Sequence, residues 1–319
     1  MNYIDKNFYN VINEIKSKDV YDIYFHILEK FKNISETTQR SMERFFAKYS
    51  YWGELRIDEG YFKVLFNKAE VFKKYLDEYA VLYESLKDYK SKYVLFSIIN
   101  DFYNFDFVNL KNATEYCFKH YFDLNLMPKL KENVFVDVGA YVGDTVLDYV
   151  ESFGEKGYKK IYCYEICQEN VDKMKINLKK FDNIEIRRKA VSDKKEKLRF
   201  DLDNDISSNH ISTGGKIEVE GVSLDEDIKE KISMVKMDIE GSEMKALAGM
   251  KEHIKNDMPI LLISVYHNNT DLVEIPKYIR SLNENYDYYL RYYGGCVYAT
   301  EIVLFALPKT KKVLVKNLI

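Results

Sequence analysis

Residues 134–145 read VFVDVGAYVGDT, and this stretch decides the fold. A short apolar run, Val134 to Val136, leads into Asp137 and a turn that contains two glycines. A helical pattern of apolar residues begins directly afterwards, at Val146. This order predicts a buried strand, a tight turn and a helix start, which is how nucleotide-binding α/β domains begin.

The acidic residues of this stretch indicate which cofactor the turn binds. Asp137 stands where a dinucleotide fingerprint requires glycine, which lets the backbone approach a pyrophosphate over a helix N-terminus. Asp144 adds a second carboxylate. Two acids repel a phosphate but suit a ligand that carries an amine and a sulfonium, such as S-adenosylmethionine. The sequence therefore favours methyl transfer.

Strand and helix patterns alternate after this first unit, which predicts a parallel sheet with right-handed crossovers. A closing antiparallel hairpin, over residues 286–294 and 301–308, is typical of the methyltransferase variant of such a sheet. The fold class expected is therefore α/β, a Rossmann-like class I methyltransferase with a mostly parallel seven-stranded sheet. Residues 197–226 are expected to form an inserted β-hairpin with a polar tip. The remaining predicted strands are 159–165, 183–191, 232–238 and 259–267, and the predicted helices are 168–180, 243–254 and 272–283.

The N-terminal third has helical periodicity and almost no glycine or proline. An apolar stripe over residues 82–96 predicts one long helix, and Ser35 is expected to start an earlier helix. A short helix is expected over residues 113–122. We therefore predict a small helical domain over residues 1–112 and a methyltransferase domain over residues 113–319.

Bulk properties exclude several classes of protein. The chain has 319 residues and a net charge of −3, which argues against nucleic acid as an obligatory partner. The longest apolar stretch, residues 260–266, is too short to span a bilayer, and the N-terminus has no apolar leader segment. The four cysteines are sparse and form no metal-binding pairs. A reduced, cytoplasmic setting is expected. The oligomeric state is not predicted.

Ligands of open α/β sheets bind beyond the carboxyl ends of the strands, so the residues that end each strand are the candidates for the site. The turn after the first strand should hold the amino acid part of the donor. Glu165 ends the second strand, where an acid suits the ribose diol, and Val191 and Ser192 end the third, beside the adenine. The predicted donor-binding residues are Asp137, Gly139, Ala140, Tyr141, Gly143, Asp144, Thr145, Glu165, Ile166, Val191, Ser192 and Asp238.

The fourth and fifth strands supply the candidate catalytic residues, which are His267, Asp238 and Glu240. Asp238 directly follows the fourth strand and should point to the methyl group, with Glu240 two residues on. Glu243 is expected to start a helix, where an acid complements the helix dipole. His267 or Asp238 is the expected base, with a preference for His267, whose ordinary pKa suits neutral pH. His120 lies in a helical pattern and is expected to be a packing or surface residue.

Three segments in this order and spacing, DVGAYVGDT, KMDIEGSE and VYHNNTDLVEIP, resemble the FkbM family of S-adenosylmethionine-dependent methyltransferases. The resemblance covers about residues 113–308. It implies a class I methyltransferase fold and O-methylation of a hydroxyl, often on a sugar of a glycan or on a natural product. By position it assigns donor binding to the first two strand ends and places Asp238, Glu240 and His267 by the methyl group. The Ser207-Ser208 stretch resembles a variable insert of the family that could contact the acceptor.

Other interpretations remain open. A nicotinamide-dependent oxidoreductase or epimerase is disfavoured by Asp137, Asp144 and the missing G-x-G-x-x-G triple. A non-catalytic module, in which the helical region docks a larger glycan-biosynthesis assembly, is a third possibility. Asp238, Glu240, His267 and Asn268 could alternatively hold a divalent metal that orients the hydroxyl, although no metal is the favoured prediction. The expected partner is a small-molecule or glycan acceptor.

Overall fold

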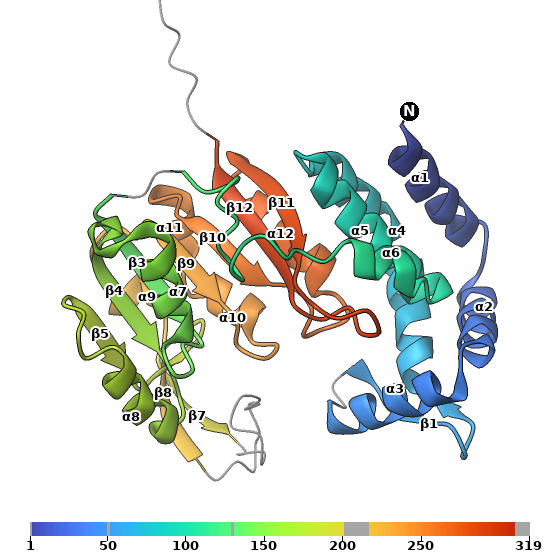
Figure 1. Cartoon of the computed structure of the whole chain (residues 1–319), viewed down its shortest axis with the longest axis horizontal. Coiled ribbons are helices and arrows are strands. Elements are labelled where there is room, and N and C mark those ends of the chain that lie inside the picture. The colour runs from blue at the N-terminus through green and yellow to red at the C-terminus, as the bar shows by residue number, and fades with distance from the viewer. Residues whose placement is uncertain (1, 50–51, 129–130, 201–216, 310–319) are drawn as a thin grey trace, which may run out of the picture.

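The computed structural model describes residues 2–49, 52–128, 131–200 and 217–309. Figure 1 shows a helical region, blue to teal, beside an α/β region that runs from green to red. The predicted contact residues Ser207 and Ser208 lie outside the described residues. Within the described ranges, no helix combines the length and the apolar character needed to cross a bilayer.

The helical region consists of amphipathic helices whose apolar sides face one another. Ser35 caps its helix as predicted, because its hydroxyl oxygen accepts the backbone N–H of Thr38 at 3.2 Å. A two-stranded hairpin lies between the third and fourth helices. The elements are α1 (Tyr3–Lys16), α2 (Val20–Asn33), α3 (Glu36–Lys48), β1 (Leu55–Arg56), β2 (Tyr61–Phe62), α4 (Lys63–Ser85), α5 (Tyr89–Asn104) and α6 (Phe107–Asn112).

The predicted long helix over residues 82–96 is wrong, because the chain breaks between α4 and α5. Asp88 caps α5 by accepting the backbone N–H of Ser91 at 2.7 Å. Leu86 forms an isolated bridge with Tyr288 of the sheet. A cap and a bridge to a distant strand thus interrupt an apolar periodicity that is continuous in the sequence.

The predicted helix over residues 113–122 is also wrong. Thr114 bridges Tyr292, and the backbone N–H of Glu115 donates to the carbonyl oxygen of Tyr292 at 2.6 Å. Tyr121 has a left-handed backbone with φ of +68°. The start of the segment therefore bonds to the end of β11 (Tyr286–Tyr292), and Lys119 and Phe122 bridge each other within the segment.

The central sheet confirms the predicted class I methyltransferase fold. Its strand order is β11-β12-β10-β9-β3-β4-β5, and β12 runs antiparallel to both of its neighbours while the other neighbouring pairs are parallel. Alternate residues of β3 face different cores, with Phe135 on one side of the sheet and Val136 on the other. The strands besides β11 are β3 (Asn133–Val138), β4 (Tyr158–Tyr164), β5 (Ile184–Arg187), β9 (Met234–Met237), β10 (Ile260–Ser264) and β12 (Ile302–Pro308).

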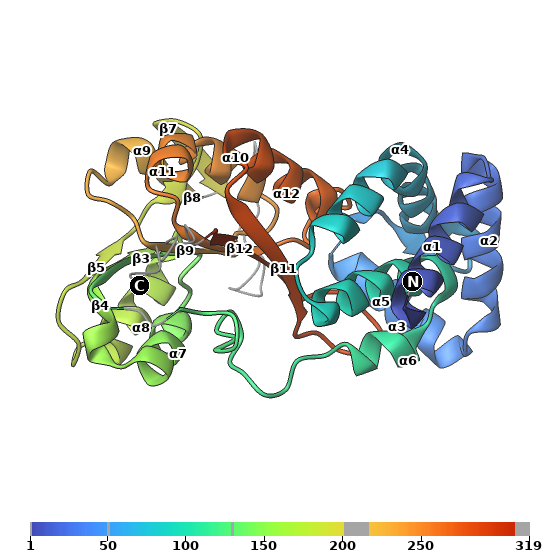
Figure 2. The ribbon, with the colours of Figure 1, turned by 90° about the horizontal axis from the view of Figure 1, so that it is seen from above.

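Helices cover both faces of this sheet. Figure 2 shows α7 and α8 on one side and α9 to α12 on the other. In addition, α5 packs on β11 and α4 packs on α12, which joins the helical region to the sheet. The boundary at residues 112 and 113 stays a prediction. The covering elements are α7 (Asp144–Phe153), the 3₁₀ turn η2 (Glu155–Gly157), α8 (Gln168–Asn177), α9 (Leu224–Asp227), α10 (Glu243–Ala248), α11 (Lys251–Asn256) and α12 (Asp271–Leu282).

Two predicted elements are each divided in the structure. Residues 183–191 form β5 of the main sheet and β6 (Ala190–Val191), which joins a second sheet of order β6-β8-β7. The expected inserted hairpin is present as antiparallel β7 (Glu196–Phe200) and β8 (Ile217–Val222). The predicted helix over residues 243–254 is split into α10 and α11 at Gly249, which packs so tightly on Ser192 that a Cβ would lie 1.9 Å from its carbonyl oxygen.

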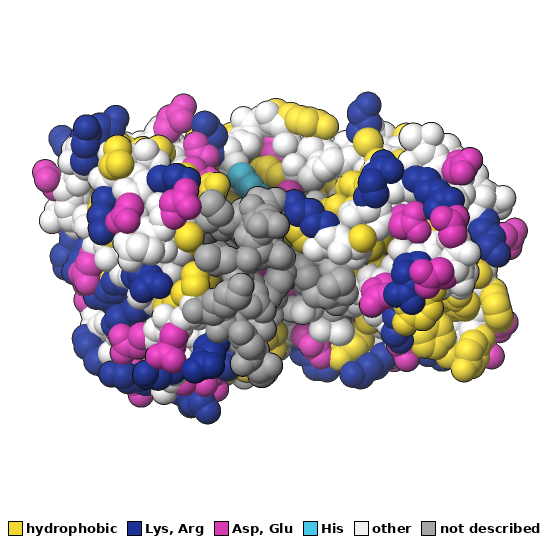
Figure 3. Space-filling view, turned by 90° about the horizontal axis from the view of Figure 1, so that it is seen from below, with side chains coloured by type: hydrophobic (Ala, Val, Ile, Leu, Met, Phe, Trp, Pro, Cys, Tyr) yellow, Lys and Arg dark blue, Asp and Glu magenta, His cyan; other side chains and the backbone are white. Residues whose placement is uncertain are grey.

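The face of the molecule drawn in Figure 3 carries basic and acidic side chains of both signs, interspersed over the α/β region. Hydrophobic side chains gather near the far end of the helical region in the same view. On the described part of this face, therefore, charge of one sign does not dominate.

Candidate active site

A cavity of about 440 Å³ lies at the carboxyl ends of β3, β4, β9 and β10, where ligands of α/β sheets bind. Its size suits a ligand as large as a nucleoside derivative. The turns after the strands supply most of its wall. The predicted site residues that line it are Gly139, Tyr141, Asp144, Thr145, Glu165, Ile166, Val191, Asp238, Glu240 and His267.

The first turn is fixed by a close approach between two strand ends. Gly139 has φ of +78°, and a Cβ at this position would lie 1.9 Å from the carbonyl oxygen of Asp238. The N–H groups of Gly139 and Ala140 both donate to the carbonyl oxygen of Tyr164, each at 3.0 Å. Only glycine fits here, and its contacts bring the ends of β3, β4 and β9 together at one point.

Glu165 links the second strand end to this turn. Its Oε2 accepts the backbone N–H of Tyr141 at 2.9 Å, and its Oε1 accepts that of Cys167 at 2.8 Å. Burial raises the pKa of this carboxyl above its ordinary value. The side chain of Asn170 and the backbone of Ile166 also hydrogen-bond to this carboxylate.

Asp137 lies behind the cavity wall, so the expectation that it contacts the donor directly is revised. Its side chain is fully buried, and Oδ1 lies 3.2 Å from the Nζ of the equally buried Lys236. The same ammonium donates to the carbonyl oxygen of Gly139 at 2.7 Å. The Asp137 carboxylate therefore fixes the Lys236 ammonium through an ion pair, and this ammonium fixes the turn through its hydrogen bond to Gly139. The acids on the wall itself are Asp144, Glu165, Asp238, Glu240 and Glu301.

Ala140, Gly143 and Ser192 also lie behind the wall rather than on it. Gly143 precedes α7 and packs against α8, where a Cβ would lie 2.9 Å from atoms of Met174 and Leu178. The N–H of the fully buried Ser192 donates to the carbonyl oxygen of Val222 at 2.8 Å. These residues position the wall through packing and backbone hydrogen bonds.

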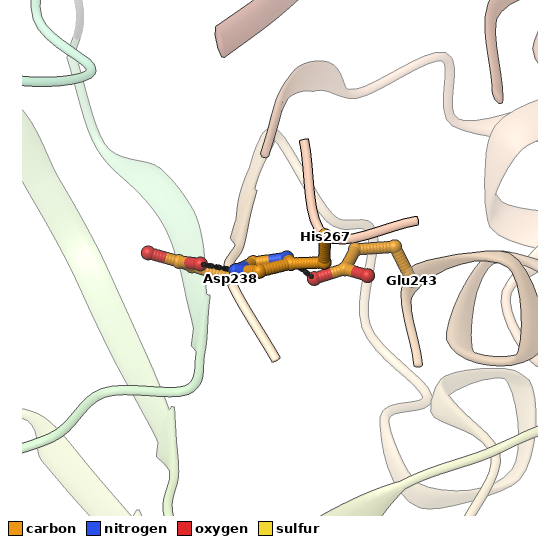
Figure 4. A group of neighbouring side chains, drawn as sticks. All are labelled: Asp238, Glu243 and His267. Atoms are coloured by element: carbon orange, nitrogen blue, oxygen red, sulfur yellow. Dashed lines mark hydrogen bonds and ion pairs between the residues drawn. The ribbon is translucent and has the colours of Figure 1, made fainter. Parts of the chain in front are cut away.

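His267 lies between carboxylates on both sides of its ring (Figure 4). Its Nδ1 is 2.8 Å from Glu243 Oε1, and its Nε2 is 3.4 Å from Asp238 Oδ1 and 3.7 Å from Glu240 Oε2. Burial by itself lowers the pKa of His267, but Glu243, Asp238 and Glu240 together outweigh burial and raise it to about 10.

This environment overturns the reason for choosing His267 as the base. An imidazole with a pKa of about 10 already carries its second proton at neutral pH and cannot accept another. Asp238 stays ionised, because the charges of His267 and Lys236 outweigh its burial and lower its pKa. Glu243 begins α10, as predicted, and its Oε1 also accepts the backbone N–H of Ile239 at 2.9 Å.

Several residues of the cavity wall were not predicted, because no sequence motif marks them as site residues. The hydroxyl of Tyr121 donates to Asp238 Oδ2 at 2.7 Å, and His120 stacks on the Tyr121 ring at 4.0 Å. Burial lowers the pKa of His120 to about 4, so its ring is neutral. Glu301 accepts the hydroxyl of Tyr266 at 3.2 Å, and burial together with Asp238 raises its pKa to about 7. His120 and Tyr121 precede the three sequence motifs, and Glu301 follows them.

The helical region contributes an aromatic part of the wall. Phe45, Tyr49 and Trp52 line the cavity, and the indole N–H of Trp52 donates to the carbonyl oxygen of Tyr266 at 2.9 Å. Phe45 stacks on Tyr298 at 4.0 Å. Because Tyr266 precedes His267, this aromatic group lies on the His267 side of the cavity.

Comparisons with known proteins find a matching family model and solved structures of similar fold. Residues 137–289 match the model of the methyltransferase FkbM domain, which confirms the resemblance seen in the sequence. The structure of methyltransferase FkbM from Methylobacillus flagellatus KT aligns with a TM-score of 0.62 and 20% identity over 74% of this chain. The aligned part spans 60% of that longer chain. A search of the curated proteins found none that matches.

Smaller methyltransferases also align, over 56% of this chain. An rRNA methylase from Streptococcus thermophilus gives a TM-score of 0.38 at 13% identity and is covered over 89% of its length. A putative methyltransferase from Streptococcus mutans, in complex with SAH, gives 0.35 at 10% identity and is covered over 91%.

Proposed function

We propose that the protein, whose residues 137–289 match the model of the methyltransferase FkbM domain, transfers the methyl group of S-adenosylmethionine to a hydroxyl of a sugar, a glycan or a related natural product. The observation that carries this proposal is the convergence of Asp144, Glu165 and Asp238 on one cavity at the strand ends. Carboxyl side chains outnumber Lys189 and Lys236 on this wall, which favours the cationic sulfonium and amine of the donor over a pyrophosphate.

Each part of the donor has a suitable part of the wall. Glu165 is the proposed acceptor of the ribose hydroxyls, and backbone N–H groups of Tyr141 and Cys167 fix its carboxylate at the end of β4. The turn over residues 139–144 takes the amino acid end. Ile166 and Val191 line the cavity with apolar surface and are assigned to the adenine, and Asp238 is assigned to the side of the methyl group.

The aromatic wall supports a sugar as acceptor. The apolar faces of a sugar ring pack well on aromatic side chains, and Phe45, Tyr49 and Trp52 come from outside the methyltransferase sheet. In this arrangement the helical region takes part in choosing the acceptor, while the sheet binds the donor.

Methyl transfer is an in-line displacement in which the acceptor oxygen forms a bond to the methyl carbon as the carbon–sulfur bond breaks. Aligning the two reactants supplies about 7–11 kcal/mol of the barrier reduction. The hydroxyl must also lose its proton, and a base adds a factor of about 10²–10⁴. We assign this proton to Glu301, which lies on the wall with a pKa of about 7, whereas His267 is already protonated.

This assignment predicts the pH dependence of the reaction. The base must be ionised, so the rate should rise with pH and level off above about 7, the pKa of Glu301. Glu301→Gln should remove this acidic limb and lower kcat by about 10²–10⁴. Glu169→Gln, at an exposed position on α8, is the control and should keep the wild-type profile. An unchanged limb in Glu301→Gln would exclude this role.

The function itself is tested by incubating the purified chain with S-adenosylmethionine and a panel of sugars, sugar nucleotides, oligosaccharides and natural products. Mass spectrometry should find an acceptor that gains one methyl group, with S-adenosylhomocysteine formed in equal amount. Methylation confined to an amine or a carbon would contradict O-methylation. Binding of NAD in place of S-adenosylmethionine would support the oxidoreductase alternative instead.

A further inference from the structure

The two nitrogens of His267 differ in how closely their partners approach. Nδ1 lies 2.8 Å from Glu243 Oε1, a normal length for a charge-assisted hydrogen bond. Glu243 is itself fixed by the backbone N–H of Ile239 at 2.9 Å. A histidine that donates one N–H to a buried carboxylate, with its other nitrogen turned away, has the arrangement found behind metal-binding histidines.

The Nε2 side of the ring is left open. Nε2 is buried and makes no hydrogen bond with any described residue, and the same holds for Asp238 Oδ1, the atom nearest to it. These atoms lie 3.4 Å apart, well beyond the 2.8 Å reached on the Nδ1 side. Glu240 Oε2 lies 3.7 Å from Nε2. With ligand bonds of about 2.0–2.2 Å, neighbouring ligand atoms of one ion lie about 3.0–3.5 Å apart, which is close to this spacing.

The backbone and a neighbouring tyrosine hold the two acids in place. The hydroxyl of Tyr121 donates a hydrogen bond to Asp238 Oδ2, so Oδ1 is the oxygen that is available to a ligand. Glu240 has a left-handed φ of +54°, an unusual conformation for a residue other than glycine. Backbone strain of this kind gathers at functional sites.

From this geometry we propose that the cavity binds one divalent metal ion through His267 Nε2, Asp238 Oδ1 and Glu240, with Glu243 as the outer carboxylate that orients the imidazole. Because a metal-ligating nitrogen must be deprotonated, the ion takes the place of the proton that Nε2 carries in the metal-free protein, and this proton is released to solvent. Asp238, Glu243 and His267 all have ligand atoms within 4.8 Å of one another. However, Asp238 and Glu243 contact opposite nitrogens of the ring, as Figure 4 shows, so a single ion at Nε2 excludes Glu243.

The ligand set indicates the class of metal. One imidazole with two carboxylates suits a first-row transition ion such as Mn²⁺, Fe²⁺ or Zn²⁺ better than Mg²⁺ or Ca²⁺, which prefer oxygen ligands alone. Positions not filled by the protein remain open to the acceptor. The role of the ion rests on the proposed function: it would bind the acceptor hydroxyl and make its proton easier to remove, while Glu301 receives the proton.

The test is a titration of the chelator-treated, dialysed protein with Mn²⁺, followed by the loss of the free-ion signal in electron paramagnetic resonance. We expect one saturable site per chain. Asp238→Asn and Glu240→Gln should each weaken Mn²⁺ binding at least tenfold, and Glu243→Gln by about 10–100-fold. Glu240 is partly exposed, so its substitution should leave the fold intact, which circular dichroism can check.

Glu165→Gln is the matched control, because it alters a carboxylate of the same cavity outside the ligand set. It should keep the wild-type affinity for Mn²⁺ and lose affinity for S-adenosylhomocysteine. Wild-type protein that binds S-adenosylhomocysteine but shows no saturable Mn²⁺ site overturns the metal inference alone. A folded Glu240→Gln that binds Mn²⁺ as tightly as the wild type overturns it as well. Protein that binds Mn²⁺ but not S-adenosylhomocysteine supports the metal site and overturns the proposed function.

Discussion

Replacing Gly139 with alanine should abolish binding of the methyl donor. The added Cβ would lie 1.9 Å from the carbonyl oxygen of Asp238, and the residue would have to keep φ of +78°. Since both groups belong to backbone, relief requires the turn after β3 to move away from the end of β9. Asp144 and Asp238 would then no longer face the same ligand. We expect the affinity for S-adenosylhomocysteine to fall at least about 100-fold, measured by isothermal titration calorimetry.

Gly154→Ala provides the matched control for this substitution. Gly154 also has a positive φ, +73°, but no atom of the described residues lies within 4 Å of the Cβ that alanine would add. Both substitutions place alanine at a positive φ that L residues rarely adopt, and Gly139→Ala adds the collision with the carbonyl oxygen of Asp238. Gly154→Ala should bind S-adenosylhomocysteine like the wild type. Equal affinities in the two variants would show that the close approach at Gly139 is not needed.

Lys236→Met should cause the largest loss of stability among these substitutions. Lys236 and Asp137 are both buried in the sheet, with Nζ 3.2 Å from Oδ1. Removal of the ammonium leaves the Asp137 carboxylate buried without its charged partner, which typically costs about 3–5 kcal/mol. The carbonyl oxygen of Gly139 loses its hydrogen bond in addition. Urea denaturation of the variant and the wild type gives the change in the free energy of unfolding.

The double variant Asp137→Asn/Lys236→Met separates the cost of an unpaired, buried Asp137 carboxylate from the cost of losing the contacts of the Lys236 side chain. It should recover part of the stability lost in Lys236→Met, because no charge then stays buried alone. Lys197→Met is the control: its ion pair with Glu218 lies on the surface, and its loss should leave the free energy of unfolding nearly unchanged. If the urea midpoint of Lys236→Met equals that of the wild type, the ion pair between Asp137 and Lys236 does not stabilise the turn after β3.

The fold could be predicted because its determinants are local in the sequence. The apolar run ending at Asp137, the glycine at 139 and the helix pattern after Asp144 specify a strand, a turn and a helix without any distant contact. Repeated strand and helix patterns then fix a parallel sheet. Because ligands of such sheets bind at the strand ends, the sequence alone also places Glu165 and Asp238 in one site.

Other features depend on contacts between distant segments and have no local pattern. Tyr121 reaches Asp238 from a segment whose start bonds to β11 and which does not form the predicted helix. Glu301 and Phe45 arrive at the cavity from opposite ends of the chain. The charge on His267 depends on Glu243, whose place at a helix start is visible in the sequence but whose inward direction is not.

Titration of the purified chain with S-adenosylhomocysteine, in the wild type and in Glu165→Gln, tests most directly whether carboxylates at the strand ends form a donor site. The wild type should bind one molecule per chain. Glu165→Gln should bind at least about tenfold more weakly, because an amide replaces the charged acceptor of the ribose hydroxyls. Absence of binding to the wild type, or wild-type affinity in Glu165→Gln, would contradict a donor site of this kind.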